Sequence, residues 1–93
     1  MKEICEKELK KLEEVFSDII IPVRDKSELY KSSKNILAFV KAYFEDSKFF
    51  YEKGKYLESF ELCSYIWGFL DCLAILGLIT PRKTRKYFKI EQD

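Results

Sequence analysis

The chain has 93 residues, of which 47% are hydrophobic, 16% are aromatic and 35% are charged, and its formal net charge is +1. A single domain has this length, and three Gly and two Pro disfavour an all-β or loop-rich fold. Histidine is absent from the sequence, which removes the commonest general base, His-activated nucleophiles and most zinc sites.

The first segment, from about residue 2 to 20, is predicted to be an amphipathic helix. Its apolar residues step by four and three, with Glu and Lys between them: Cys5, Leu9, Leu12, Phe16 and Ile19. The stretch IIPVRDKS then interrupts the pattern, because Pro22 disfavours helix at the residue before it. Asp25 and Glu28 have the spacing of a capping box, which predicts the start of a second helix.

Two more helices are predicted over about residues 27–53 and 55–78, separated by Gly54. A glycine at this point suits a helix C-terminus, where positive φ is common. Three amphipathic helices with short connections fold most simply as a three-helix up-and-down antiparallel bundle with a long central helix. We therefore expect an all-α domain over residues 1–79, followed by a short basic C-terminal tail over residues 80–93.

Residues 62–79 form a nearly continuous apolar block with one charge, Asp71. A short transmembrane span and a site carboxylate are alternatives to a buried bundle helix. We expect the bundle helix, with Asp71 as a buried anchor that is hydrogen-bonded or ion-paired. Counting back from the turn at Gly54 puts it level with Leu37, and its expected neighbours are Ser33, Lys34 and Lys41. Gly68 and Gly77 are expected at points of close helix approach.

The three cysteines and the acidic residues do not indicate a metal or cofactor site. Cys63 and Cys72 are nine residues apart, which puts them on opposite faces of one helix. Reduced, buried thiols in a cytoplasmic chain are the expectation. The acids near the turn at residue 54 are interpreted as a solvated face: Glu45, Asp46, Glu58 and Glu61. No catalytic residue, cofactor or small-molecule substrate is predicted.

Basic charge is concentrated in the tail. Residues 1–79 hold 12 Lys/Arg and 14 Asp/Glu, a balance of −2, whereas residues 80–93 hold five and two, a balance of +3. Nucleic-acid contact is one hypothesis for the tail, with phosphates bound by basic side chains and a base stacked on an aromatic ring. The candidate contact residues are Arg82, Lys83, Arg85, Lys86 and Tyr87. The alternative is that Tyr87 and Phe88 pack back on the bundle.

Residues 42–78 resemble the archaeal family of small helical proteins catalogued as domain of unknown function 357. The resemblance is carried by a pattern of aromatic, glycine and acidic positions: Tyr43, Asp46, Phe50, Gly54, Tyr56, Tyr65, Gly68, Leu70, Asp71, Gly77 and Leu78. The chain departs from the family pattern where alanine is usual, at Ser59, Ile66 and Cys72. The resemblance implies a three-helix bundle and a cytoplasmic protein, and it carries no established activity.

Three functions are kept as hypotheses, and none of them is enzymatic. A non-enzymatic protein-interaction or homo-oligomerising module is the first, because an aromatic-rich bundle of this size can leave apolar surface for a partner or a second copy. A nucleic-acid-binding accessory protein that uses the basic tail is the alternative. A membrane-associated protein is the third.

Overall fold

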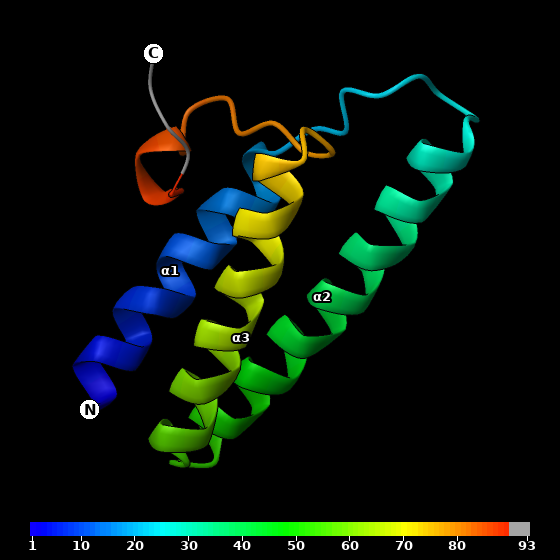
Figure 1. Ribbon diagram of the computed structural model, residues 1–93. Helices are drawn as coiled ribbons and strands as arrows, with labels where there is room; N and C mark the ends of the chain where they lie inside the picture. The colour runs from blue at the N-terminus through cyan, green and yellow to red at the C-terminus, as the bar shows by residue number, and fades with distance from the viewer. Residues whose placement is uncertain (90–93) are drawn as a thin grey trace.

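The computed structural model describes residues 1–89 and confirms the all-α fold with three packed helices (Figure 1). Helix α1 covers Lys2–Asp18, α2 covers Glu28–Glu52 and α3 covers Tyr56–Ile75, and a short 3-10 helix, η1, covers Arg85–Tyr87. The longest helix is the central one, α2, as predicted. The last four residues of the predicted tail, 90–93, lie outside the described residues.

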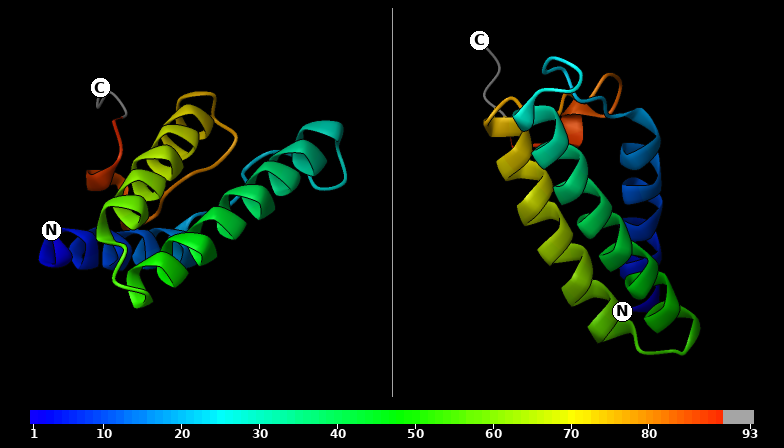
Figure 2. Two further views of the ribbon diagram at one scale, coloured as in Figure 1. Left: turned by 90° about the horizontal axis from the view of Figure 1, so that it is seen from below. Right: turned by 90° about the vertical axis from the view of Figure 1, so that its right-hand side faces the viewer.

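Helix α2 runs antiparallel to α1 and α3, and its N-terminal end diverges from both of them (Figures 1 and 2). The α1–α2 connection and the segment after α3 lie at the same end of the bundle, opposite the α2–α3 turn. They are joined by an antiparallel bridge in which Ile20 and Thr80 exchange backbone hydrogen bonds of 3.0 and 2.8 Å. The first and last parts of the chain are therefore tied together at one end.

Glycine in the left-handed region ends both helices of the α2–α3 hairpin. Gly54 has a φ of 77°, and the amide of Lys55 donates to the Phe50 carbonyl at 2.9 Å, so the predicted helix stop at Gly54 is confirmed. Gly77 has a φ of 75°, and the amide of Leu78 donates to the Leu73 carbonyl at 2.9 Å. This second cap ends α3 at Ile75, three residues before the predicted end.

The expectation that Gly68 and Gly77 mark close helix approach is wrong. Both residues are exposed, and a Cβ atom built on either one would meet no other heavy atom within 4 Å. Gly77 serves the helix cap, whereas Gly68 leaves open space on the surface of α3. Close approach occurs at other small residues, as described below.

Helix α2 begins at a serine cap and not at the predicted capping box. Ser27 is the N-cap, and its hydroxyl accepts a hydrogen bond of 3.1 Å from the amide of Tyr30. Asp25 lies two residues earlier, and Lys26 between them has a φ of 65°. The capping interaction was therefore assigned two residues too early in the sequence.

The core is formed by apolar residues of all three helices and of the C-terminal segment. Its fully or almost fully buried members are Leu12, Val15, Leu37, Val40, Phe44, Ile66, Leu70, Leu73, Ile79 and Phe88. Most of these follow the predicted helical spacing. Phe88 comes from the predicted tail, so part of that tail belongs to the core.

A buried polar cluster joins the three helices near the α2–α3 turn. Ser47 of α2 and Ser59 of α3 each donate to the other's backbone carbonyl, at 2.9 and 2.8 Å. The Cys5 thiol of α1 donates to the Ser59 hydroxyl at 3.0 Å, and the Cys63 thiol lies 3.3 Å from the Ser47 hydroxyl. Such bonds between side chain and backbone require the α2 and α3 backbones to lie close together, which only small side chains allow.

Replacement of Ser59 by leucine tests this contact. Ser59 is fully buried, so Ser59→Leu overpacks the α2–α3 contact and breaks its hydrogen bonds. We expect the free energy of unfolding in urea to fall by about 1–3 kcal/mol. The control is Ser64→Leu at an exposed position of the same helix, where the change should stay within about 0.5 kcal/mol. Equal effects of the two substitutions would contradict the close contact.

Candidate functional site

Four aromatic side chains form a continuous ladder on the outer face of the α2–α3 hairpin. Phe39 and Tyr43 of α2 and Tyr65 and Phe69 of α3 are called the aromatic ladder below. Ring centroids are 5.1 Å apart for Phe39 and Tyr43, 5.5 Å for Tyr43 and Tyr65, and 5.3 Å for Tyr65 and Phe69. Phe39 and Tyr65 are each 55% exposed, so the ladder presents large rings to solvent.

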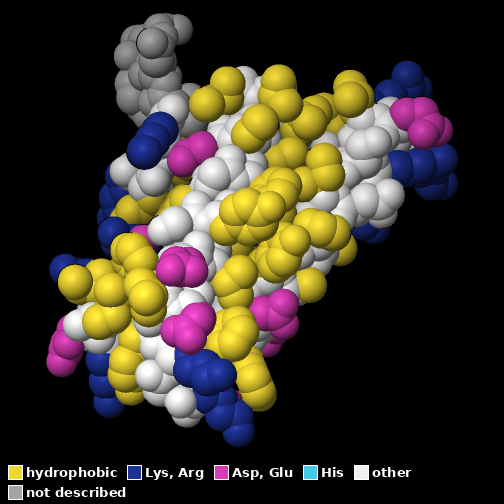
Figure 3. Space-filling model, turned by 60° about the horizontal axis from the view of Figure 1, so that its bottom comes forward, with side chains coloured by type: hydrophobic (Ala, Val, Ile, Leu, Met, Phe, Trp, Pro, Cys, Tyr) yellow, Lys and Arg dark blue, Asp and Glu magenta, His cyan; other side chains and the backbone are white. Residues whose placement is uncertain are grey.

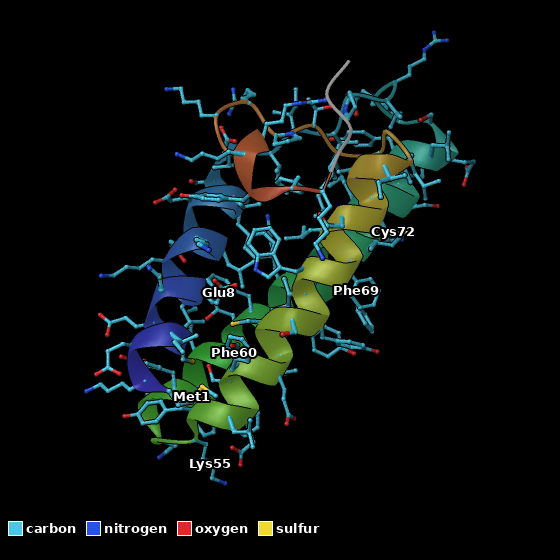
Figure 4. The ribbon with its side chains drawn as sticks, turned by 60° about the vertical axis from the view of Figure 1, so that its left-hand side comes forward. Met1, Glu8, Lys55, Phe60, Phe69 and Cys72 are labelled. Atoms are coloured by element: carbon cyan, nitrogen blue, oxygen red, sulfur yellow. The ribbon has the colours of Figure 1, made fainter. Side chains whose placement is uncertain are left out.

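Uncharged residues of α3 extend the ladder toward the C-terminal end of the helix. Cys72 and Leu76 follow Phe69 at intervals of three and four residues and share its face. Figure 4 shows Phe69 and Cys72 on the side of α3 that points away from α1. The exposed positions from here to the cap are all uncharged: Ser64, Tyr65, Gly68, Cys72, Ile75, Leu76 and Gly77. Figure 3 shows hydrophobic side chains gathered in a band over α2 and α3.

Three acidic residues lie at the other end of this face, toward the α2–α3 turn. Asp46 of α2 and Glu58 and Glu61 of α3 are exposed. The ion pairs found within residues 1–89 involve other carboxylates. The face is therefore apolar over most of its length and acidic at one end, which confirms a solvated environment for these acids.

The other side of α3 is covered by α1 and by the C-terminal segment. The Trp67 ring lies 5.8 Å from the ring of Phe88 and 6.5 Å from that of Tyr87. Its indole Nε1 donates to Glu8 of α1 at 3.1 Å. The Tyr87 hydroxyl donates to Glu14 at 3.0 Å, which raises the pKa of the tyrosine. The prediction that Tyr87 and Phe88 pack on the bundle is confirmed.

Asp18, the last residue of α1, holds the C-terminal segment in place. Its carboxylate accepts hydrogen bonds of 2.7 Å from the Thr84 hydroxyl and 2.9 Å from the Thr84 amide. The amides of Arg82 and Lys83 donate to the same carboxylate at 3.0 and 2.9 Å. The Thr84 hydroxyl bond, followed by the backbone bonds, lowers the pKa of Asp18 from 3.8 to about 2. This interaction is called the Asp18 clasp below.

The predicted surroundings of Asp71 are wrong. Its side chain is half-buried and accepts a hydrogen bond of 3.0 Å from the amide of Lys89, so its partner belongs to the C-terminal segment and not to α2. The reason is the direction in which the side chain points. Leu70 is fully buried in the core, and one further residue is about 100° around the helix. Ser33, Lys34 and Lys41 are therefore not its neighbours.

The candidate nucleic-acid residues are divided by the structure into two kinds. The four basic residues have exposed side chains: Arg82, Lys83, Arg85 and Lys86. Tyr87 is half-buried, and its hydroxyl and ring already contact the bundle. The segment thus presents basic charge, but the aromatic ring expected to stack on a base is engaged elsewhere.

Other residues of the family pattern lie at the α2–α3 corner. Tyr56 packs against Tyr51 with ring centroids 5.3 Å apart, and the Lys55 ammonium lies 6.0 Å from the centre of the Phe50 ring. With Gly54 between them, these residues shape the turn. Tyr43 and Tyr65 of the same pattern lie instead in the aromatic ladder.

Two of the three thiols are buried, as expected, and the third is not. Cys5 and Cys63 lie in the core, and burial raises the pKa of Cys63 to about 11, which keeps its thiol protonated at neutral pH. Cys72 is exposed beside the aromatic ladder, so the expectation of a buried thiol is wrong there. Sequence spacing had placed Cys63 and Cys72 on opposite faces but had not shown which face was solvent-exposed.

Residues 1–89 contain no group of three or more His, Cys, Asp or Glu side chains placed to hold a metal ion. In the same part of the chain, no helix combines the length and apolar character needed to cross a bilayer. The apolar block over residues 62–79 is divided between α3, its glycine cap and the segment that follows.

The fold and surface define a small three-helix bundle with one covered and one open hairpin face. The chain belongs to the family described as Protein of unknown function (DUF357), whose model matches residues 7–79. The match covers all of α2 and α3 and most of α1. No curated protein and no solved structure matches the chain.

Acidification should open the Asp18 clasp. Because the pKa of this carboxyl is lower in the folded chain than its unfolded value near 4, the clasp stabilises the segment above about pH 4. This contribution is lost as the pH falls through about 2. We expect the carboxyl carbon of Asp18 to titrate near pH 2 by NMR, with the Thr84 amide resonance moving in parallel.

At neutral pH, Asp18→Ala should expose the basic segment to trypsin. Cleavage after Arg82 and Lys83 should become about tenfold faster, because a charge-assisted hydrogen-bond network is removed. Asp25→Ala, in the exposed α1–α2 connection, is the control and should leave the cleavage rate unchanged. A segment that resists trypsin equally in both variants would show that the clasp does not hold it.

Proposed function

We propose that this protein is a non-enzymatic interaction module whose binding surface is the aromatic ladder with its extension to Cys72 and Leu76. The observation that carries the proposal is the exposure of large rings on a face without charge along most of its length. Monomeric proteins rarely expose apolar patches larger than a few hundred Å² unless the patch has a function. Aromatic residues are also enriched in the centres of protein interfaces.

Burial of the ladder would supply substantial binding energy. An aromatic side chain has about 150–250 Å² of surface, and Phe39 and Tyr65 are each 55% exposed. Covering the remainder of each ring removes about 100 Å² from water, worth about 2.5 kcal/mol per ring at 25 cal/mol per Å². Part of this gain offsets the entropy lost on association, so several rings must act together.

A cytoplasmic location is part of the proposal. Its support is the state of the cysteines, which are free: Cys5, Cys63 and Cys72. Free thiols persist in the reducing compartments of cells, whereas oxidising compartments favour disulfides.

A photo-crosslinking amino acid placed at Tyr65 tests whether the ladder is a binding surface. In cells that express the full chain, we expect covalent adducts of defined mass from this position. The matched control is the same amino acid at Ile4 of α1, which is also 55% exposed and lies far from the ladder. Equal labelling from both positions, or labelling from neither, would overturn the proposal.

A nucleic-acid role for the basic segment is the second candidate. It is favoured by the exposure of Arg82, Lys83, Arg85 and Lys86 on a segment that the Asp18 clasp holds in one conformation. Pre-ordering lowers the entropy cost of contacting phosphates.

Fluorescence anisotropy with labelled RNA and DNA tests this second candidate. A chain in which the four basic residues are changed to serine should bind more weakly than the unaltered chain. The dependence of log K on log salt should also become shallower by up to about four phosphate contacts. Binding that is absent, or that does not change with salt, would exclude this role.

A further inference from the structure

We infer that the partner covering the aromatic ladder is a second copy of this chain, packed hairpin on hairpin with its helices antiparallel to those of the first. The inference rests on the proposed function, since it names the partner of the same surface. It would place four helices, α2 and α3 of each copy, around a shared apolar interface. Three features of the face support a self-complementary contact.

The first feature is the alternation of projecting rings and open space. The hairpin pairs Tyr43 with Tyr65 and Phe39 with Phe69, whose centroids are 5.5 and 6.3 Å apart. Beside these rings, Gly68 leaves a shallow hollow of about 390 Å³ lined also by Ser64, Tyr65, Phe69 and Cys72. A ring from an identical face can enter this hollow while the reciprocal ring enters its counterpart, as two-fold symmetry requires.

The second feature is the size of the face. Helix α3 has 20 residues and is about 30 Å long, and two packed helices are about 20 Å wide. The hairpin face therefore has a flat area of about 600 Å², and its accessible area is larger because side chains project from it. A stable interface buries about 800 Å² per partner, so one copy of this face is large enough for a dimer.

The third feature is the distribution of charge. The apolar part of the face requires a partner surface that is also uncharged, because an unpaired charge buried against it would be costly. An identical face meets this requirement. Sequence alone supplies it at the concentration of the protein itself, without a second gene product.

The acidic end of the face determines the orientation. In a parallel dimer, Asp46, Glu58 and Glu61 of one copy would lie against the same three residues of the other and repel them. In an antiparallel dimer they lie instead toward the N-terminus of α2 of the other copy, near Lys26 and Lys31. The positive end of the helix dipole and the two lysines favour that arrangement. It also brings Cys72 of the two copies close together, since Cys72 is near the middle of the apolar part.

Sedimentation equilibrium of the full chain, from about 1 μM to about 1 mM, tests the dimer. We expect a monomer–dimer equilibrium that Tyr65→Glu weakens by about tenfold or more, because it buries a charge. Ile4→Glu has the same exposure on α1 and should leave the equilibrium unchanged. Phe39→Glu provides a second substitution in the ladder, and circular dichroism confirms that each variant is folded. Dimerisation that persists in both ladder variants would overturn the inference.

A short bis-maleimide tests the orientation, because Cys72 is the exposed one of the three cysteines. Antiparallel packing predicts a cross-linked species of twice the chain mass that Cys72→Ser abolishes. A dimer that does not cross-link would overturn the antiparallel arrangement.

These results also separate the inference from the proposed function. A wild-type chain that stays monomeric to about 1 mM, while the Tyr65 photo-crosslinker captures a different molecule, rejects the second copy and supports the interaction module. A monomer with no adduct from Tyr65 rejects both. A Tyr65 adduct whose mass is twice that of the chain supports both.

Discussion

The contact between Ser47 and Ser59 sets the geometry on which the rest of the molecule depends. The two hydroxyls donate to each other's backbone carbonyls at 2.9 and 2.8 Å, which fixes how closely α2 and α3 approach and at which level they meet. From this level, the antiparallel helices bring Tyr43 beside Tyr65 and Phe39 beside Phe69. The order of the aromatic ladder is thus a consequence of a polar contact several turns away.

The α2–α3 hairpin has two faces with different roles. One face is covered twice, by α1 and by the C-terminal segment that the Asp18 clasp and the Trp67–Phe88 contact hold in place. The other face is left open and carries the aromatic ladder. A basic segment that seemed free in the sequence is therefore structural along part of its length, whereas a helix that seemed destined for full burial is exposed on one side.

Sequence periodicity predicted the three helices, their order and the stop at Gly54, because apolar spacing and left-handed glycine act locally. It placed Asp71 at the right level along α3 but in the wrong direction, since a one-residue change rotates a side chain by about 100°. The exposure of Phe39 and Cys72 and the clasp at Asp18 were missed. They depend on which face α1 and residues 80–89 cover, and no local pattern encodes that choice.

The most direct test of this account is a nuclear Overhauser spectrum of the folded chain with assigned aromatic rings. The hairpin level set by Ser47 and Ser59 predicts cross-peaks between the rings of Tyr43 and Tyr65, whose centroids are 5.5 Å apart, and of Tyr65 and Phe69, at 5.3 Å. It also predicts cross-peaks between Phe39 and Tyr43, at 5.1 Å. A folded chain that lacks the Tyr43–Tyr65 cross-peak would contradict the hairpin register and, with it, the surface proposed for binding.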